Sequence, residues 1–135
     1  MKNLIVSHNE INGIPSGRHK IGNVVVYSGL SDHGISTPVA TMDQIVETEN
    51  EIGEIDTVYV YVGVVFARNA VELIRNLVKQ KKRVCMIACD CFGAEKKVLA
   101  CRLSVQLVAC ECGGRDTCTQ LISELSGAIA LPETQ

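Results

Sequence analysis

The sequence has no tryptophan and only two phenylalanines among its 135 residues. Aromatic side chains that stack on bases or sugars are therefore scarce, and no basic face is interleaved with aromatics, so we expect no nucleic-acid partner. Long apolar runs are missing as well, which argues against a signal peptide and against a membrane span. The expectation is a cytoplasmic protein that binds neither nucleic acid nor membranes.

Charge is nearly balanced, with a formal net value of -2. The basic residues are scattered, apart from a run at 79–83 that closes a predicted helix, where cations favour the helix dipole. A length of 135 residues and a hydrophobic content of 47% are enough for the core of one ordinary domain. No linker-like or low-complexity tract divides the chain. We therefore predict a single domain over residues 1–135.

The second half of the chain alternates short β-branched runs with helical segments, a pattern typical of βαβ units and a parallel sheet. We predict strands at 4–7, 23–28, 57–65, 84–88 and 103–109, and helices that begin near residues 37, 69, 94 and 117. The predicted fold is α/β, with a mostly parallel sheet of about five strands flanked by helices. It resembles flavodoxin-like and Rossmann-like three-layer domains in architecture, and such a resemblance carries no function.

The first part of the chain has a less regular pattern. The segment 16–20 is predicted to be a short basic loop, and the turn signal Asn12-Gly13 suggests a long hairpin or an ordered loop before the second strand. In the first helix we expect Val39, Met42, Ile45, Val46 and Ile52 on the buried side.

The most specific signal in the chain is a repeat. Residues 87–93 read IACDCFG, and residues 108–114 read VACECGG, so the same pattern returns after 21 positions. Each copy is an apolar run followed by Ala, Cys, an acid, Cys and a glycine turn. Sequential strands joined by a short connection are usually neighbours. We therefore expect Cys89 to lie near Cys110, and Cys91 near Cys112.

Seven cysteines, an odd number, in a cytoplasmic chain are typical of reduced thiols, metal ligands or redox groups. Four thiolates, from Cys89, Cys91, Cys110 and Cys112, predict an all-cysteine zinc site or an iron-sulfur cluster. Sulfurs on one zinc are roughly 3.8 Å apart, whereas strand residues two apart are separated by about 6.6 Å. Chelation therefore requires the backbone to curl after the first cysteine of each pair, and the glycines that follow permit this.

Two alternatives use the same cysteines without metal. Parallel neighbours about 4.8 Å apart fall within the Cα range of a disulfide, so redox chemistry is one of them. Cys118 is then the predicted catalytic nucleophile, because the first turn of the last predicted helix lowers a thiol pKa. Cys110 or Cys112 would be the resolving cysteine, which forms a disulfide with Cys118. In the other alternative the cysteines only pack, as small buried thiols commonly do, and we expect Cys85 and Cys101 to belong to the core.

A second candidate site is the segment 29–37, which reads GLSDHGIST. It has the two-glycine spacing of a phosphate loop and precedes a predicted helix, but it lacks the lysine, which argues against a Walker-type nucleotide site. Backbone amides at a helix N-terminus can still hold an anion. The predicted ligand-binding residues are Gly29, Asp32, His33, Gly34 and Ser36, and His33 can act as a general base or a metal ligand.

Two hypotheses from different classes follow. In the first, the protein binds a metal ion or an iron-sulfur cluster at the carboxyl edge of its sheet and uses it for redox chemistry or sulfur handling. In the second, it is a non-enzymatic domain that binds a small molecule or a protein partner through residues 29–36 and keeps its cysteines reduced. A homo-oligomeric structural protein, with an apolar surface left over for its own copies, is a third alternative.

Overall fold

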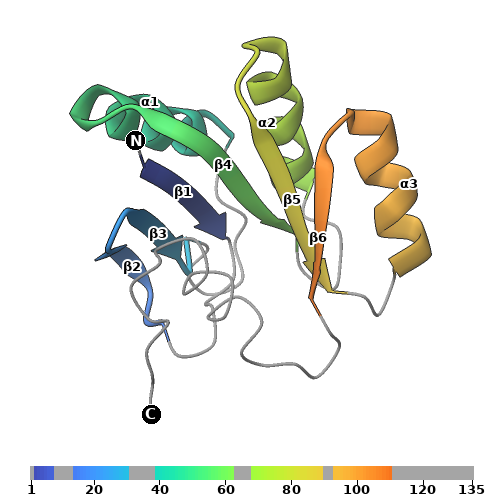
Figure 1. Ribbon diagram of the computed structural model, residues 1–135, viewed down its shortest axis with the longest axis horizontal. Coiled ribbons are helices and arrows are strands. Elements are labelled where there is room, and N and C mark those ends of the chain that lie inside the picture. The colour runs from blue at the N-terminus through green and yellow to red at the C-terminus, as the bar shows by residue number, and fades with distance from the viewer. Residues whose placement is uncertain (1, 8–13, 31–38, 63–67, 90–92, 111–135) are drawn as a thin grey trace.

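The computed structural model describes residues 2–7, 14–30, 39–62, 68–89 and 93–110. These residues form six strands and three helices: β1 (Lys2–Ser7), β2 (Gly17–Ile21), β3 (Val24–Ser28), α1 (Val39–Ile52), β4 (Ile55–Val62), α2 (Arg68–Lys79), β5 (Val84–Cys89), α3 (Gly93–Leu103) and β6 (Gln106–Cys110). One sheet contains all six strands in the order β2-β3-β1-β4-β5-β6 (Figure 1). Only β2 is antiparallel to its neighbour, so the predicted α/β fold with a mostly parallel sheet is confirmed.

The order of the strands explains where the helices lie. From β3 the chain crosses β1 to reach β4, and it then adds β5 and β6 in the same direction. Because parallel crossovers are right-handed, connections that run in one direction lie on one face of the sheet. Accordingly, α1, α2 and α3 all pack on the same side (Figure 1).

The chain between β1 and β3 reaches the other face of the sheet at Ile14. Ile14 belongs to this connection and is buried on that face against a second apolar cluster. The Ser28 hydroxyl also donates a hydrogen bond to the Ile14 carbonyl oxygen at 3.0 Å. The second cluster contains Ile5, Ile14, Val24, Val26 and Ile87, with Tyr59 and Tyr61 packed against it.

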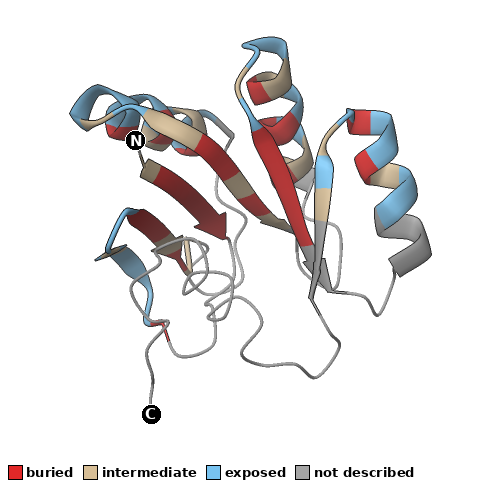
Figure 2. Ribbon diagram, in the orientation of Figure 1, coloured by how far each residue is buried: buried red, intermediate tan, exposed pale blue. Residues whose placement is uncertain are grey.

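Strand alternation divides the apolar residues between the two faces, as the sequence predicts for β4. Val58 and Val60 face the helices, whereas Tyr59 and Tyr61 face the second cluster. On the helix side, buried positions of α1 and α2 form much of the main core, and Ala100 and Leu103 of α3 add to it (Figure 2). The core residues of α1 and α2 are Met42, Val46, Ala70, Leu73, Ile74 and Leu77.

Three local predictions are wrong. The expected basic loop at 16–20 is largely the strand β2, which pairs with β3 across a tight turn at 22–23. Ile52 is exposed, because it is the last residue of α1. The last predicted strand begins at Gln106, since Leu103 still belongs to α3 and is buried against the core.

The helices α2 and α3 end in the same way. The amide of Lys82 donates to the Leu77 carbonyl at 3.1 Å and that of Lys81 to Val78 at 2.9 Å. After α3, Val105 donates to Ala100 at 3.0 Å and Ser104 to Cys101 at 3.1 Å. Both hydrogen-bond patterns define a Schellman motif, in which the residue after the cap adopts a left-handed conformation. That position is held by Lys81 at φ 62° and by Ser104 at φ 58°, although glycine is the usual residue there.

Glycine at either position is expected to stabilise the fold. The left-handed backbone costs a residue with a side chain roughly 1–2 kcal/mol, and part of the gain is offset by the greater freedom of glycine in the unfolded chain. Lys81→Gly and Ser104→Gly should each raise the free energy of unfolding by about 0.5–1 kcal/mol in urea titrations. Lys79→Gly, inside the last turn of α2, serves as the control and should lower it by about 1 kcal/mol. A loss of stability in both Schellman variants would contradict this account.

Candidate functional site

The two copies of the repeat begin side by side on adjacent strands. In the parallel pair β5 and β6, Cys85 is the register partner of Gln106, Ile87 of Val108, and Cys89 of Cys110. The offset between partners is therefore 21 residues along the whole ladder, the same as the offset of the sequence repeat. Cys89 and Cys110 are the last pair, at the carboxyl edge of the sheet. The expectation that Cys89 lies near Cys110 is confirmed at the level of the backbone.

The other predicted residues of this site lie outside the described residues. This applies to the metal-ligand candidates Cys91 and Cys112 and to the predicted nucleophile Cys118. Within the described part of the chain, no group of three or more His, Cys, Asp or Glu side chains is placed to hold a metal ion. The metal site therefore stays a prediction that depends on the strand ends and on the residues that follow them.

Of the five predicted ligand-binding residues, only Gly29 falls in the described ranges; Asp32, His33, Gly34 and Ser36 lie outside them. Gly29 follows β3 with a φ of 60°, and a Cβ atom at this position would overlap the Ser16 hydroxyl and lie 2.9 Å from the Ser16 Cβ. The next amide, Leu30 N, donates to the Ser7 carbonyl at 3.2 Å. Close packing at this turn is enough to explain why glycine is required here.

A buried ion cluster that the sequence analysis did not predict connects α1 with three strands. Glu49 of α1 has only 1% of its side chain exposed. Its carboxylate accepts hydrogen bonds from Lys2 Nζ of β1 at 3.0 Å and from Arg18 of β2, through Nε at 2.7 Å and Nη2 at 3.2 Å. The Tyr27 hydroxyl of β3 donates to the same carboxylate. Four donors thus compensate for the desolvation of one charge.

These contacts shift the ionisation of the cluster. The hydrogen bond from Arg18 is the largest cause that lowers the pKa of Glu49, from 4.5 to about 2, and it outweighs the effect of burial. Burial, followed by the hydrogen bond to Glu49, raises the pKa of Tyr27 to about 12. A carboxylate this acidic, with its oxygens engaged by donors, is a poor general base near neutral pH. We therefore interpret the Glu49 cluster as a structural anchor.

Comparison with known proteins leaves the function open. No protein-family model matches the chain, and no curated protein matches its sequence. Among solved structures, the chain is similar to the FeoB G-domain from Methanococcus jannaschii, with 14% identity and a TM-score of 0.48 over 94% of this chain and 99% of that one. A shared activity does not follow from a likeness of this degree. Within the described segments, none of the helices combines the length and apolar content needed to cross a membrane.

The two cysteines with described side chains differ in their surroundings. Cys85 on β5 is buried, as predicted, and its thiol donates a hydrogen bond to Gln106 Oε1 at 3.5 Å. Burial raises the pKa of the Cys85 thiol, so it remains protonated near neutral pH. Cys101 is exposed on α3, so its assignment to the core is wrong. It lies on the outer side of the helix, away from Ala100 and Leu103, which face the core.

Proposed function

We propose that the protein binds a metal ion or an iron-sulfur cluster through the thiolates of Cys89, Cys91, Cys110 and Cys112, for redox chemistry or sulfur handling. The observation that carries this proposal is the register of Cys89 with Cys110 at the carboxyl end of β5 and β6. In open α/β sheets this edge is the usual location of ligand sites. Thiolates are the shared ligands of all-cysteine zinc sites and of iron-sulfur clusters.

Chain connectivity supports the inclusion of the second cysteine of each motif. Consecutive Cα atoms are about 3.8 Å apart, so Cys91 lies within about 7.6 Å of Cys89, and the same bound applies to Cys112 and Cys110. The two strand ends themselves are about 4.8 Å apart. In addition, β5 ends at Cys89 and α3 begins at Gly93, so Cys91 belongs to a connection of only three residues. The chain changes direction in a short strand-to-helix connection. Two cysteines of one segment need such a change of direction to bring both sulfurs to one metal ion.

The test is elemental analysis with a count of free thiols on the full chain, purified without oxygen. We expect one zinc or several irons per chain, with about four of the thiols protected from alkylation. The variant Cys91→Ser/Cys112→Ser should lose the metal. The control Cys85→Ser/Cys101→Ser removes the same number of thiols and should keep it. Metal-free protein with seven thiols that react after denaturation would overturn the proposal.

The same register favours a second candidate, a reversible disulfide between Cys89 and Cys110. The spacing of adjacent strands falls within the Cα range of a disulfide. Exchange with a small-molecule disulfide would join the two sulfurs and release two small thiols, so that the cysteines are oxidised and the small disulfide is reduced. Metal-free protein treated in this way should yield a peptide pair linked through Cys89 and Cys110 in mass spectrometry. Linkage only through Cys101 would contradict this candidate.

A further inference from the structure

A polar cleft lies at the opposite, amino edge of the sheet, and its floor is on the face that turns away from the helices. Its floor is a row of three register partners, Tyr59 of β4, Cys85 of β5 and Gln106 of β6. Its rim comes from residues 82–84, where the chain passes from α2 into β5, and from residues 104–105, between α3 and β6, with Thr57 of β4 and Val78 of α2 beside them. The cleft has a volume of about 410 Å³. This volume is within the range of roughly 300–1,000 Å³ found for sites that take small molecules.

Several hydrogen-bond donors in this cleft have no partner among the described residues. The Cys85 thiol donates to Gln106 Oε1, which leaves the amide NH2 group of Gln106 free to donate to a ligand. Within the described residues, the hydroxyls of Tyr59 and Ser104 also have no hydrogen-bond partner, and both residues line the cleft. An amide and two hydroxyls that are free to donate suit a ligand rich in oxygen atoms.

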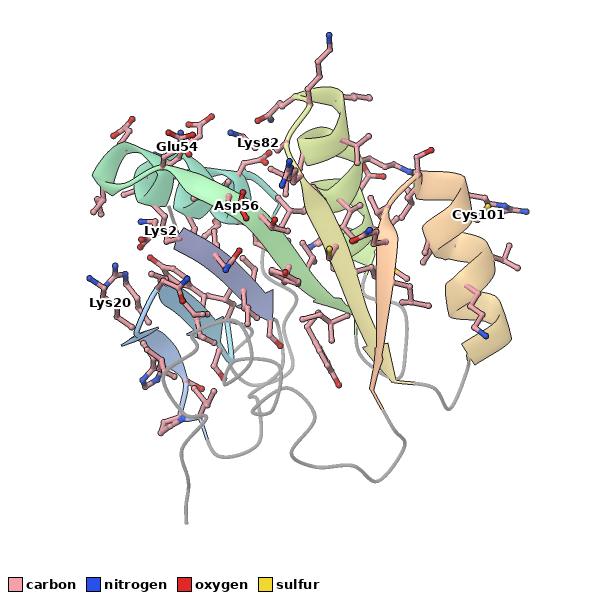
Figure 3. The ribbon with its side chains drawn as sticks, in the orientation of Figure 1. Lys2, Lys20, Glu54, Asp56, Lys82 and Cys101 are labelled. Carbon is pink, nitrogen blue, oxygen red and sulfur yellow. The ribbon has the colours of Figure 1, made fainter. Side chains whose placement is uncertain are left out.

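The two charged side chains that line the cleft are both positive, and Asp56 acts on Tyr59 from outside it. Lys82 and Arg83 are on its rim, and none of the residues that line it is an aspartate or a glutamate. Arg83 contacts Asp56 at 3.6 Å, but the Arg83 side chain is 77% exposed. An ion pair this long and this exposed contributes little, so Arg83 can turn to another anion at small cost. Lys82 also lines a neighbouring cleft, together with Glu54 and Asp56. Lys82, Glu54 and Asp56 lie near the start of β4 and β5 (Figure 3).

We propose that this cleft binds a small metabolite through a phosphate or carboxylate group. The guanidinium of Arg83 can donate hydrogen bonds to two oxygens of such a group, and Lys82 adds a compact positive charge. The donors of Tyr59, Ser104 and Gln106 take the remaining oxygens. The site lies at the edge opposite Cys89 and Cys110, so it is independent of the thiol chemistry proposed above.

The experiment is a heteronuclear NMR titration of the full chain at constant ionic strength, with chloride as the balancing anion. Inorganic phosphate and malonate are the two probes, and their relative affinities distinguish phosphate from carboxylate ligands. We expect saturable shifts of the backbone amides of Lys82, Arg83, Ser104 and Gln106. Lys82→Gln/Arg83→Gln should weaken binding at least tenfold, because it removes both positive charges that line the cleft. Tyr59→Phe should weaken it severalfold.

The matched control is Lys20→Gln/Arg75→Gln, which removes the same charges from β2 and from the exposed surface of α2. It should leave both affinities unchanged. Equal weakening by the control would mean that the anions respond only to net charge, and the proposal would fail. It would also fail if neither probe gave saturable shifts, or if the shifts were spread over the whole surface. Loss of binding in the Lys82→Gln/Arg83→Gln variant with unchanged metal content separates this site from the cysteine edge.

Discussion

Replacement of Glu49 by glutamine is expected to lower the free energy of unfolding by about 3 kcal/mol. The variant keeps the size of the side chain but removes the charge that Lys2 and Arg18 share. Loss of one partner from a buried pair typically costs about 3–5 kcal/mol, because the remaining charge is left desolvated. The lower end of that range applies here, since the Arg18 side chain is 42% exposed and can turn to water. Urea denaturation measures the effect.

The control is Glu51→Gln, an exposed position on the same helix. It removes an equal charge from α1 and should change stability by less than about 0.5 kcal/mol. If Glu49→Gln were as mild as Glu51→Gln, the ion cluster would be an incidental contact and not an anchor.

Acid should remove the same stabilisation from the natural chain. Glu49 has a pKa of about 2 in the folded protein, below its ordinary value of 4.5, so the unfolded state binds more protons between these values. The ionised Glu49 carboxylate therefore contributes its full stabilisation above about pH 4.5. This contribution to the free energy of unfolding falls as the pH approaches 2, by about 3 kcal/mol in all. The Glu49→Gln variant should lack this part of the pH dependence. An identical slope in both proteins would assign acid sensitivity to other carboxylates.

Replacement of Gly29 by alanine is the second large effect that we expect, also about 3 kcal/mol of destabilisation. Two costs combine at this position. Its φ of 60° is unfavourable for a residue with a Cβ atom, and that atom would meet the side chain of Ser16. The measurement is the midpoint and slope of urea unfolding.

Two other glycines separate the two costs. Gly17 has a φ of 122°, and the space that a Cβ atom would enter there is open, so Gly17→Ala should show the backbone cost alone, about 1–2 kcal/mol. Gly53 has neither problem, since the atom nearest to an added Cβ would be Lys2 Nζ at 3.8 Å. Gly53→Ala should be close to neutral. If Gly29→Ala and Gly17→Ala lowered the free energy of unfolding by the same amount, the contact with Ser16 would relax without cost.

The sequence predicts the parallel part of this fold well, because its strands are buried on both faces and consist of β-branched runs. The repeat also predicts the neighbours Cys89 and Cys110, since short connections favour adjacent strands. The strand β2 is missed for a physical reason. It lies at the edge of the sheet with most of its residues exposed, and charged residues such as Arg18 and Lys20 suit an edge but hide the apolar alternation of a strand.

The Glu49 cluster is missed because its members are far apart in the chain. The only local signal is that Glu49 falls on the same helical stripe as Met42 and Val46, where a buried charge needs a partner. No periodicity identifies Lys2, Arg18 and Tyr27 as that partner set. The amino-edge cleft is missed for the same reason, since its floor forms only when three strands are in register.

The central position of β1 has a consequence for the order of folding during synthesis. This strand is synthesised before the other five described strands, yet Val6 pairs with Tyr27 on one side and with Val60 on the other. Such distant pairings close large loops and tend to form slowly. Until β4 has been synthesised, one edge of β1 is unpaired, and this strand contains Leu4, Ile5 and Val6, which are buried in the folded protein. The nascent chain is therefore prone to strand-mediated aggregation through β1 before β4 emerges, and the pairing with β4 covers this edge of β1.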